Sequence, residues 1–402
     1  MDFEILILGS DVNAYYMARC THEAYKKKAY MLIKSPLAYT TSSKIINHIY
    51  NDKIWDEKEF VKAINKFAKE HANKKVIVIS SNETYASFLV SNKKHFENNI
   101  LFNYPDTKIL ESLINKELFY KTFSNSVLSF PKTLYTTAKK FSISSIDFQY
   151  PIIIKPANVV LYNHINFAGK KKIYKLNNED ELLDAINCIK NSDYDDTLII
   201  QEFIPGDDSH LFDSVVYSSK DKDVKLISFA QIGLQEHSPN MVGNAAVVIN
   251  GYNSFNIDTL SIVNDIREFM NSISYSGFAE FDLKYDERDG KFKVLEINAR
   301  QGRCSYYITP LGFNLVKLLV DDLLYDKNIN FTYANKKTML TFVNKSIIKR
   351  YITNEDYKKE ALRLYKNSVN PIKYSKDFSI KRELLYIKRS KNYKKAYKMY
   401  EW

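Results

Sequence analysis

Short apolar runs, each followed by a polar turn and a helical pattern, occupy the first part of the chain. Residues 3–8 form such a run, followed by a Gly-Ser-Asp turn and by apolar residues at helical spacing. Further apolar runs lie at residues 30–33 and 75–80. Strands that alternate with helices in this way are typical of a parallel sheet. The pattern therefore predicts a small α/β domain over residues 1–115.

Beyond this region the periodicity switches several times between the spacing of helices and that of strands. Helical periodicity covers residues 111–123, 178–190 and 257–273. Apolar or alternating runs that predict strands lie at residues 150–155, 197–204, 211–217, 224–232, 277–285 and 291–299. The last two are separated by residues 286–290, which are rich in Asp and Gly and predict a hairpin turn. This second region is predicted to be α+β, with antiparallel strands.

The composition is that of a globular protein with room for more than one core. The chain has 402 residues, of which 45% are hydrophobic and 26% are charged; at about 150 residues per domain, this length predicts two to three domains. The mean hydropathy of −0.35 excludes collagen-like, low-complexity and disordered classes. No run approaches the roughly 20 apolar residues of a membrane-spanning helix, and no secretory leader is visible. The three cysteines are widely spaced, which argues against a disulfide framework or a zinc cluster and favours the cytoplasm.

Positive charge is concentrated at the end of the chain. Residues 331–402 contain 19 of the 58 Lys and Arg residues but 6 of the 47 Asp and Glu residues, so the preceding part is close to neutral. Four tyrosines are interleaved with these basic residues: Tyr386, Tyr393, Tyr397 and Tyr400. A basic face with aromatic side chains is typical of a surface that meets nucleic acid, an anionic membrane or a phosphorylated substrate. A solvated, lysine-rich surface helix gives the same pattern, and both interpretations stay open.

The two strands that flank residues 286–290 carry the clearest indication of chemistry. Side chains two residues apart on a strand point to the same face. The first strand thus aligns Glu280, Asp282 and Lys284, and the second aligns Glu296, Asn298 and Arg300. Mg²⁺ prefers carboxylate and amide oxygens, which it supplements with water and phosphate oxygens, and an adjacent Arg can hold a phosphoryl group. A solvent-facing hairpin with alternating ion pairs is the other interpretation.

Three further features precede this hairpin in a fixed order. Lys121 follows a helical stretch, Lys155 ends an apolar strand, and residues 201–208 (QEFIPGDD) end the next strand. An ammonium group in a cleft can bind phosphate as a point charge. Gly9 does not form the GxGxxG pattern of dinucleotide-binding domains, so we interpret it as a structural turn. The co-occurrence of the three features with the acidic hairpin favours a functional site over a charged surface.

The segments that carry these features resemble the ATP-grasp superfamily, and within it the carboxylate–amine ligases that include D-aspartate ligases. The resemblance rests on residues 9–19 (GSDVNAYYMAR), 152–156 (IIIKP), 201–210 (QEFIPGDDSH), 277–286 (GFAEFDLKYD) and 295–309 (LEINARQGRCSYYIT). It implies an ATP-grasp fold, in which two α+β subdomains grip ATP, preceded by a small Rossmann-like parallel α/β domain. The implied domains are residues 1–115, an ATP-grasp domain at 116–330 with lobes 116–205 and 206–330, and a basic C-terminal extension at 331–402.

The resemblance also implies which residues bind ATP. The phosphates would be contacted by Lys121 and Lys155, and by Lys172, with Lys170 and Lys171 as alternatives, from the loop at 163–172, which departs from the usual glycine-rich form. The adenine would lie against Gln201, Glu202, Phe203 and Ile204. The ribose hydroxyls would bind Asp207 or Asp208.

The remaining implied roles concern the metal and the reacting groups. Mg²⁺ would be bound by Asp282, Glu296 and Asn298, with Glu280 as the alternative to Asp282. Arg300 would steady an acyl phosphate, Arg303 would help to bind a carboxylate, and Lys284 would complete the catalytic set. Cys304 beside Arg303 is interpreted as a bystander and not as a nucleophile.

The implied activity is a two-step ligation that consumes ATP. A carboxylate attacks the γ-phosphate to give an acyl phosphate and ADP, and an amine then displaces phosphate. In the D-aspartate ligases the carboxylate belongs to D-aspartate, and the amine is the lysine side chain of a peptidoglycan precursor linked to a nucleotide or a lipid. The basic tail would attract this anionic acceptor or an anionic membrane, or would simply pack on the enzyme.

Three alternatives stay open. The first is an ATP-grasp ligase for another amino acid or peptide acceptor. The second is a biotin-carboxylase-like enzyme, for which this chain has no carrier segment. The third, from a different class, is a basic nucleic-acid-binding protein, which leaves the acidic strands unexplained, so no nucleic-acid partner is expected.

Overall fold

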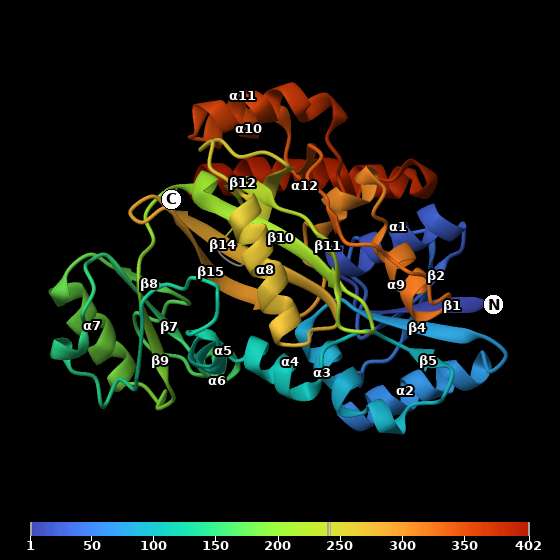
Figure 1. The fold of residues 1–402 in the computed structure, drawn as a ribbon, viewed down its shortest axis with the longest axis horizontal. Helices are drawn as coiled ribbons and strands as arrows, with labels where there is room; N and C mark the ends of the chain where they lie inside the picture. Colours follow the sequence, from blue (N-terminus) through green and yellow to red (C-terminus); the bar gives the residue numbers. More distant parts are fainter. Residues whose placement is uncertain (1, 239–240, 242, 401–402) are drawn as a thin grey trace.

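Three β-sheets and the helices around them form the molecule (Figure 1). The structure is a computed structural model and describes residues 2–238, 241 and 243–400. In Figure 1 the parallel sheet and the four-stranded sheet lie on opposite sides of a large central sheet. Short 3₁₀ helices lie at Lys93–His95, Ile143–Ser145, Asp208–His210, Ser305–Leu311, Tyr365–Asn367 and Ser375–Asp377.

The N-terminal sheet is parallel and has five strands in the order β3-β2-β1-β4-β5. The strands are β1 (Phe3–Leu8), β2 (Ala29–Ile33), β3 (Ile46–Tyr50), β4 (Lys75–Ser80) and β5 (Ile100–Leu101), connected by α1 (Val12–Tyr25), α2 (Glu57–Glu70) and α3 (Glu83–Ser91). Ile5 and Ile7 share a core with α1, whereas Leu6 and Leu8 share a core with α2. Because side chains alternate along a strand, the two helices cover opposite faces. The predicted parallel α/β sheet is confirmed.

The turns after β1 and β4 are the part of this sheet that reaches the candidate site. The two strands are neighbours, but the chain leaves them in opposite directions across the sheet, β1 toward β2 and β4 toward β5. Ligands of open α/β sheets bind at such a switch in strand order. Gly9 fits its interpretation as a structural turn, because it has φ +112° and a Cβ there would lie 2.1 Å from the Ser81 Oγ.

The second sheet is antiparallel and has four strands in the order β6-β9-β7-β8. They are β6 (Thr133–Thr136), β7 (Ile152–Pro156), β8 (Tyr174–Leu176) and β9 (Leu198–Glu202), with α6 (Val159–His164) and α7 (Glu179–Lys190) between them. Helix α7 begins where its pattern predicts, because the Asn178 side chain accepts a hydrogen bond from the Glu181 N–H at 2.9 Å. Its apolar residues pack against Ile152 and Ile154 of β7.

The central sheet has eight strands and holds the predicted acidic hairpin. Six of them run in the order β15-β14-β10-β12-β13-β17, while β11 pairs with β10 and with β16. The strands are β10 (Leu211–Ser218), β11 (Val224–Ile227), β12 (Ala230–Gln235), β13 (Ala245–Asn250), β14 (Gly277–Asp286), β15 (Lys291–Asn298), β16 (Thr332–Tyr333) and β17 (Thr338–Thr341). Helix α8 (Leu260–Ser272) packs Ile266 and Phe269 against Phe281 and Leu283 of β14.

Two element predictions are wrong in detail. The helix predicted at 111–123 is split into α4 (Thr107–Ile114) and α5 (Lys116–Phe123), because the side chain of Asn115 between them accepts hydrogen bonds from Glu117 N–H and Leu118 N–H, both at 3.0 Å. The strand predicted at 224–232 is split into β11 and β12, which continue to different neighbours. A local pattern does not reveal such a change of pairing partner.

The C-terminal basic segment is built into the body of the molecule. Its helices are α10 (Lys345–Tyr351), α11 (Glu355–Leu364) and α12 (Ile380–Met399), which follow α9 (Leu315–Leu323), and β17 is an edge strand of the central sheet. Tyr393 and Tyr397 are buried, with 7% and 0% exposure. The interpretation of these two tyrosines as part of an exposed aromatic face is therefore wrong, since they pack against the protein. None of the helices in the described part of the chain is long and apolar enough to cross a membrane.

Candidate active site

Two adjoining cavities lie where the three sheets meet. Cavity A, of about 680 Å³, lies between the turns after β1 and β4 and the β14–β15 hairpin. Cavity B, of about 570 Å³, lies between the four-stranded sheet and strands β12, β14 and β15. Both cavities are lined by Lys116, Lys155, Asp282 and Glu296. Two cations and two carboxylates thus mark the junction.

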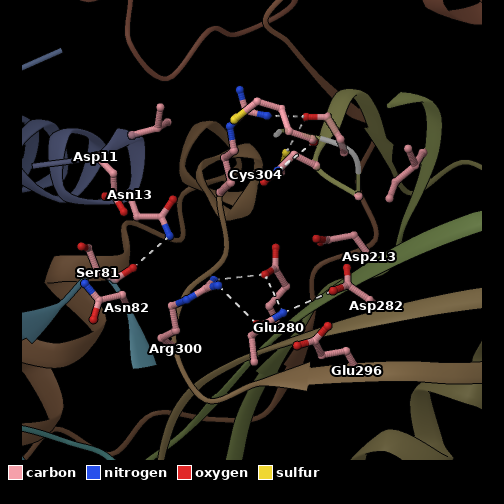
Figure 2. Close-up of a pocket in the computed structure, with 18 of the residues that line it drawn as sticks. Asp11, Asn13, Ser81, Asn82, Asp213, Glu280, Asp282, Glu296, Arg300 and Cys304 are labelled. Carbon is pink, nitrogen blue, oxygen red and sulfur yellow. Dashed lines mark hydrogen bonds and ion pairs between the residues drawn. The ribbon is translucent and has the colours of Figure 1, made fainter. Parts of the chain in front are cut away.

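The strand register explains why acidic side chains converge at this junction. Asp282 on β14 is the direct neighbour of Glu296 on β15 and of Asp213 on β10. Glu280, two residues before Asp282, is the direct neighbour of Asn298. Because these residues share one face of three adjacent strands, their side chains point into the same space (Figure 2). The predicted alignment of the hairpin residues is confirmed, and Asp213 adds a third strand to it.

Arg300 and Asn298 connect the acids by hydrogen bonds. The Arg300 Nη1 donates to the Glu280 Oε2 at 3.4 Å, and its Nη2 donates to the Asn298 Oδ1 at 3.2 Å. The Asn298 Nδ2 donates to the Asp282 Oδ2 at 3.2 Å and to the Glu280 Oε2 at 3.4 Å. The Arg300 Nε lies 2.8 Å from the Glu83 Oε1 at the start of α3. In this arrangement the amide oxygen of Asn298 faces Arg300, so a metal-binding role requires the amide group to turn.

The acids of the junction differ in how readily they ionise. Burial, followed by the charges of Glu280 and Glu296, holds the pKa of Asp282 well above its usual value. Burial likewise raises the pKa of Glu280 and raises that of Asp213 to about 6. Burial also acts to raise the pKa of Glu296, but the ion pair with Lys116 at 2.9 Å outweighs it and lowers the pKa. Burial is the largest cause of the raised values, and neighbouring carboxylates add to it at Glu280 and Asp282.

The same crowding fits a divalent cation. Asp282 and Glu296 offer carboxylate oxygens from paired strands, and Mg²⁺ typically takes one or two carboxylates and completes its shell with water and phosphate oxygens. A bound cation would favour the ionised form of Asp282. Within the described residues, no group of three or more His, Cys, Asp or Glu side chains forms a ready metal cage. Asp282 lines both cavities, whereas its rival Glu280 lines cavity A and faces Arg300.

Lys155 is partly buried at the junction of the two cavities, where an anion could contact its side-chain amine. Its Nζ lies 3.3 Å from the Tyr120 hydroxyl and over the ring of that residue. Burial, reinforced by the nearby charge of Lys116, lowers the pKa of Lys155 to about 7. A triphosphate at the junction would favour the charged form of this lysine.

Cavity B brings together the residues predicted for the adenine and the ribose. Its lining includes Gln201, Glu202, Phe203, Ile204, Asp207 and Asp208. The Gln201 Nε2 donates to the Thr133 Oγ1 at 2.8 Å, which fixes the orientation of its amide group. Asp208 accepts hydrogen bonds from the N–H and the side chain of Gln235, both at 2.7 Å. Asp207 is held by Ser209, His210 and Thr353.

The predicted catalytic residues do not form one group. Arg300 and Arg303 line cavity A, whereas Lys284 lines cavity B, where its Nζ donates to the Gly206 carbonyl at 3.0 Å and lies over Phe203. Burial lowers the pKa of Lys284 to about 8. The separation follows from the length of β14, since Lys284 lies four residues beyond Glu280 on the same strand.

Arg303 lines cavity A and is held from behind by two residues. Its Nη2 donates to the Glu236 Oε1 at 2.5 Å, and the hydroxyl of Tyr393 on α12 donates to the same oxygen at 2.7 Å. Its Nε is buried and has no hydrogen-bond partner among the described residues. The other guanidinium nitrogens donate within the protein, to the Ala245 carbonyl, Glu236 and Tyr393, so the structure does not test the carboxylate-binding role predicted for Arg303.

The structure distinguishes among the lysines predicted to contact phosphate. Lys155 lines both cavities and Lys172 lines cavity A. Lys121 lines neither; it is 52% exposed, pairs with Glu117 at 2.6 Å and lies over Tyr135. Lys116, one and a half turns earlier on α5, occupies the junction instead. Lys116 was not among the predicted residues. Both lysines belong to one helical stretch, and the spacing of its apolar residues does not show which lysine faces inward.

Other lining residues were also missed. Asp11 and Asn13 after β1, and Ser81 and Asn82 after β4, form the wall of cavity A opposite Arg300 (Figure 2). The Asn13 Nδ2 donates to the Ser81 carbonyl at 3.3 Å and to the Gln301 carbonyl at 3.4 Å, which connects both turns to the end of β15. The available signal was a polar cluster directly after each apolar run. The two runs are neighbours because of the strand order of the sheet, which the sequence of neither run predicts.

Gly302 allows Glu280 to reach its position. A Cβ at residue 302 would lie 1.5 Å from the Glu280 Oε1 and 2.0 Å from its Oε2. The Gly302 carbonyl accepts a hydrogen bond from the Tyr16 hydroxyl at 2.6 Å, which fixes this stretch of backbone against α1. The close approach therefore requires glycine.

Comparisons with known proteins agree with this architecture. No protein-family model matches the chain. The D-aspartate ligase of Enterococcus faecium (strain Aus0004) is 33% identical over an alignment of 413 residues. The alignment covers 99% of this chain and 97% of that protein. Identity at this level over nearly the full length shows the family.

Solved structures show the same fold at low sequence identity. N5-carboxyaminoimidazole synthetase from Staphylococcus aureus, complexed with ADP, has a TM-score of 0.62 at 14% identity, covering 89% of this chain and 87% of that one. The L-amino acid ligase from Bacillus licheniformis has a TM-score of 0.56 at 15% identity, covering 80% and 74%. These similarities confirm the predicted ATP-grasp fold with its preceding parallel α/β sheet. By its sequence and its fold, the chain belongs to the D-aspartate ligase family of ATP-grasp ligases.

Proposed function

We propose that this ligase uses ATP and Mg²⁺ to activate D-aspartate and joins it to the lysine side-chain amine of a peptidoglycan precursor. The observation that supports the proposal is the junction of the two cavities at Lys116, Lys155, Asp282 and Glu296. A nucleotide in cavity B would place its phosphates at this junction, next to a substrate in cavity A. The name of the 33% identical relative supplies D-aspartate as the carboxylate substrate.

The proposed first step forms an acyl phosphate. A carboxylate oxygen of the substrate attacks the γ-phosphorus of ATP, the bond from that phosphorus to the β–γ bridging oxygen breaks, and ADP leaves. Lys116, Lys155 and Lys172 hold the phosphate oxygens as cations, and Arg300 steadies the acyl phosphate. Mg²⁺, held by Asp282 and Glu296 with Asn298 after its amide turns, would neutralise charge on the phosphate oxygens.

The proposed second step forms the amide. The acceptor amine attacks the acyl carbon, inorganic phosphate leaves, and the nitrogen loses a proton. Arg303, which lines cavity A, would help to bind a carboxylate of the substrate, and Lys284 would act at the nucleotide in cavity B, where it lies. Gln201, Glu202, Phe203 and Ile204 would surround the adenine, and Asp207 or Asp208 would bind the ribose. We place the reaction in the cytoplasm, where ATP is available.

The proposal is tested with amino acids and acceptors in separate arms. The enzyme is incubated with Mg-ATP and hydroxylamine, which traps an acyl phosphate as a hydroxamate, and with D-aspartate, L-aspartate, D-glutamate or D-asparagine. We expect hydroxamate with D-aspartate and little with the others. In a second arm, a lysine-containing muropeptide nucleotide replaces hydroxylamine, and the same compound with an acetylated ε-amine is the control.

Each outcome has a defined meaning. If phosphate release and product formation require the free ε-amine, the result supports the proposed acceptor. Hydroxamate from D-aspartate without transfer to the muropeptide would contradict the acceptor and retain the donor. A preference for another amino acid would establish the alternative ATP-grasp ligase. Bicarbonate-dependent ATP cleavage would instead indicate a carboxylase.

A further inference from the structure

One side of α12 faces solvent and is divided into an apolar half and a basic half. In the first half the exposed apolar side chains are Ile380, Leu384 and Ile387, which are 75%, 61% and 47% exposed, and Lys381 and Lys388 are exposed beside them. In the second half the corresponding side chains are lysines, all exposed: Lys391, Lys394, Lys395 and Lys398. The positions follow one another at three or four residues, except that Lys394 and Lys395 are adjacent, so these side chains form one continuous row along the helix. Phe378, 57% exposed, extends the apolar end just before the helix begins.

The opposite side of α12 is fixed to the protein. Arg382, Tyr393 and Tyr397 are buried, with 3%, 7% and 0% exposure. The Tyr393 hydroxyl donates to Glu236 at 2.7 Å, and the Tyr397 hydroxyl donates to the Gln235 carbonyl at 2.5 Å. The helix therefore cannot turn to hide its apolar row, which stays at the surface at a considerable cost in apolar exposure.

Basic residues dominate the charges around the row, and the partly buried Glu383 in the first turn is the one acidic residue of α12. In the described part of the chain, none of Lys391, Lys394, Lys395 and Lys398 forms an ion pair with an acidic side chain. A groove of about 590 Å³ beside them, between α10 and α12, is lined by Lys394, Lys395, Lys398 and Arg350 together with Ile347 and Met399. The groove thus brings three exposed lysines beside the apolar side chains of Ile347 and Met399.

We propose that this side of α12 binds the surface of an anionic lipid bilayer. Apolar side chains of an interfacial helix enter the boundary between headgroups and acyl chains, while lysines bind anionic headgroups. A second copy of the chain fits less well, because a two-fold contact through this face would bring the lysines of both copies together. Nucleic acid would use the lysines but would leave Ile380, Leu384 and Ile387 exposed.

The proposal concerns a surface and not the reaction, but the two are structurally close. The buried side of α12 contacts Glu236, which lines cavity B, and Arg303, which lines cavity A. When this protein is bound to a bilayer through α12, both of its cavities would therefore lie one helix away from the membrane surface. This placement suits an acceptor that is linked to a lipid, a point that rests on the proposed function.

The test uses the full-length protein and vesicles without any substrate. Sedimentation with phosphatidylglycerol-containing vesicles is compared with that of pure phosphatidylcholine vesicles. The variants are L384Q/I387Q, which removes apolar contact, and K391Q/K394Q/K395Q, which removes charge. Matched controls are L183Q/L260Q, at exposed leucines of α7 and α8, and K58Q/K62Q/K66Q, on α2 at the opposite side of the molecule (Figure 1). All four variants replace exposed residues outside both cavities, so their phosphate release with soluble substrates should equal that of wild type.

We expect binding to the anionic vesicles that falls about tenfold or more in each α12 variant and changes less than about twofold in the controls. Equal binding to both kinds of vesicle would overturn the proposal, as would α12 variants that bind like wild type. Two further arms exclude other occupants. Loss of a dimer in L384Q/I387Q by light scattering, without vesicle binding, would assign the face to a second copy. Single-stranded DNA binding that is lost in the lysine variant and kept in L384Q/I387Q would assign it to nucleic acid.

Discussion

Asp282 on β14 and Glu296 on β15 are direct cross-strand neighbours, and both line the junction of the two cavities. We expect D282N and E296Q each to lower kcat on the order of 10³-fold, because each removes an oxygen ligand for Mg²⁺ where charge builds on the phosphate. ADP release at several Mg²⁺ concentrations measures the effect. D289N is the matched control, since Asp289 lies in the hairpin turn and pairs with Lys293. Turnover close to wild type in both junction variants would remove these residues from the metal site.

Glu280 is expected to behave differently from Asp282, because it lies in cavity A against Arg300. E280Q should raise KM for the amino acid by about tenfold while leaving the Mg²⁺ dependence unchanged. Initial rates at varied amino acid and varied Mg²⁺ separate the two effects. A shifted Mg²⁺ requirement in E280Q would make Glu280 the metal ligand.

Lys116 and Lys121 lie on one helix but face different surroundings. We expect K116A to lower kcat/KM for ATP by about 10²-fold, because it removes a cation from the junction, and K121A to change it by less than about threefold. The comparison is well matched, since both variants remove one lysine from α5. A larger loss of kcat/KM in K121A than in K116A would assign the phosphate contact to Lys121 instead.

Lys155 should couple ATP binding to pH. Its pKa of about 7 in the free protein leaves the amine largely uncharged at about pH 8, and bound phosphates would raise that pKa, so Lys155 takes up a proton when ATP binds, while a bound cation would release one from Asp282. Affinity should therefore rise as the pH falls from about 9 toward 7. Titration calorimetry in two buffers of different ionisation enthalpy measures the uptake. In K155R the guanidinium is charged throughout, so the uptake should fall, although Lys284 retains a share because its pKa is about 8. Equal uptake in wild type and K155R would contradict the prediction.

Tyr397 and Tyr400 compare a buried and an exposed side of the C-terminal helix. Tyr397 is fully buried and Tyr400 is 38% exposed. We expect Y397A to lower the free energy of unfolding by about 3–5 kcal/mol and Y400A by less than about 0.5 kcal/mol. Urea denaturation followed by circular dichroism measures both. Equal effects would mean that α12 is not packed as described, and deletion of residues 336–402 is expected to unfold the protein for the same reason.

Local patterns were sufficient for the acidic hairpin and insufficient for its surroundings. Alternation along β14 and β15 fixed the faces of Asp282 and Glu296, because a strand repeats every two residues whatever its neighbours are. Asp213 could not be added, since its contribution depends on the pairing of β10 with β14. The same holds for Asn13 and Ser81, which meet only because β1 lies beside β4. The interpretation that placed Tyr393 and Tyr397 on an exposed basic face was wrong, because a basic helix with aromatic residues has no periodic signal for which of its faces is buried.

The close approach of Gly302 to Glu280 ties the identity of one residue to the presence of the other. Alanine at position 302 would displace the carboxylate that Arg300 contacts, although the backbone around it could remain unchanged. A variant library at this position should consequently yield folded proteins with the raised KM for the amino acid that is expected of E280Q, and KM should return toward the wild-type value when a shorter acid at position 280 is supplied together with the larger residue. Natural chains of this fold that carry a side chain at the equivalent of 302 would then be expected to have lost, or relocated, the acid on the facing strand.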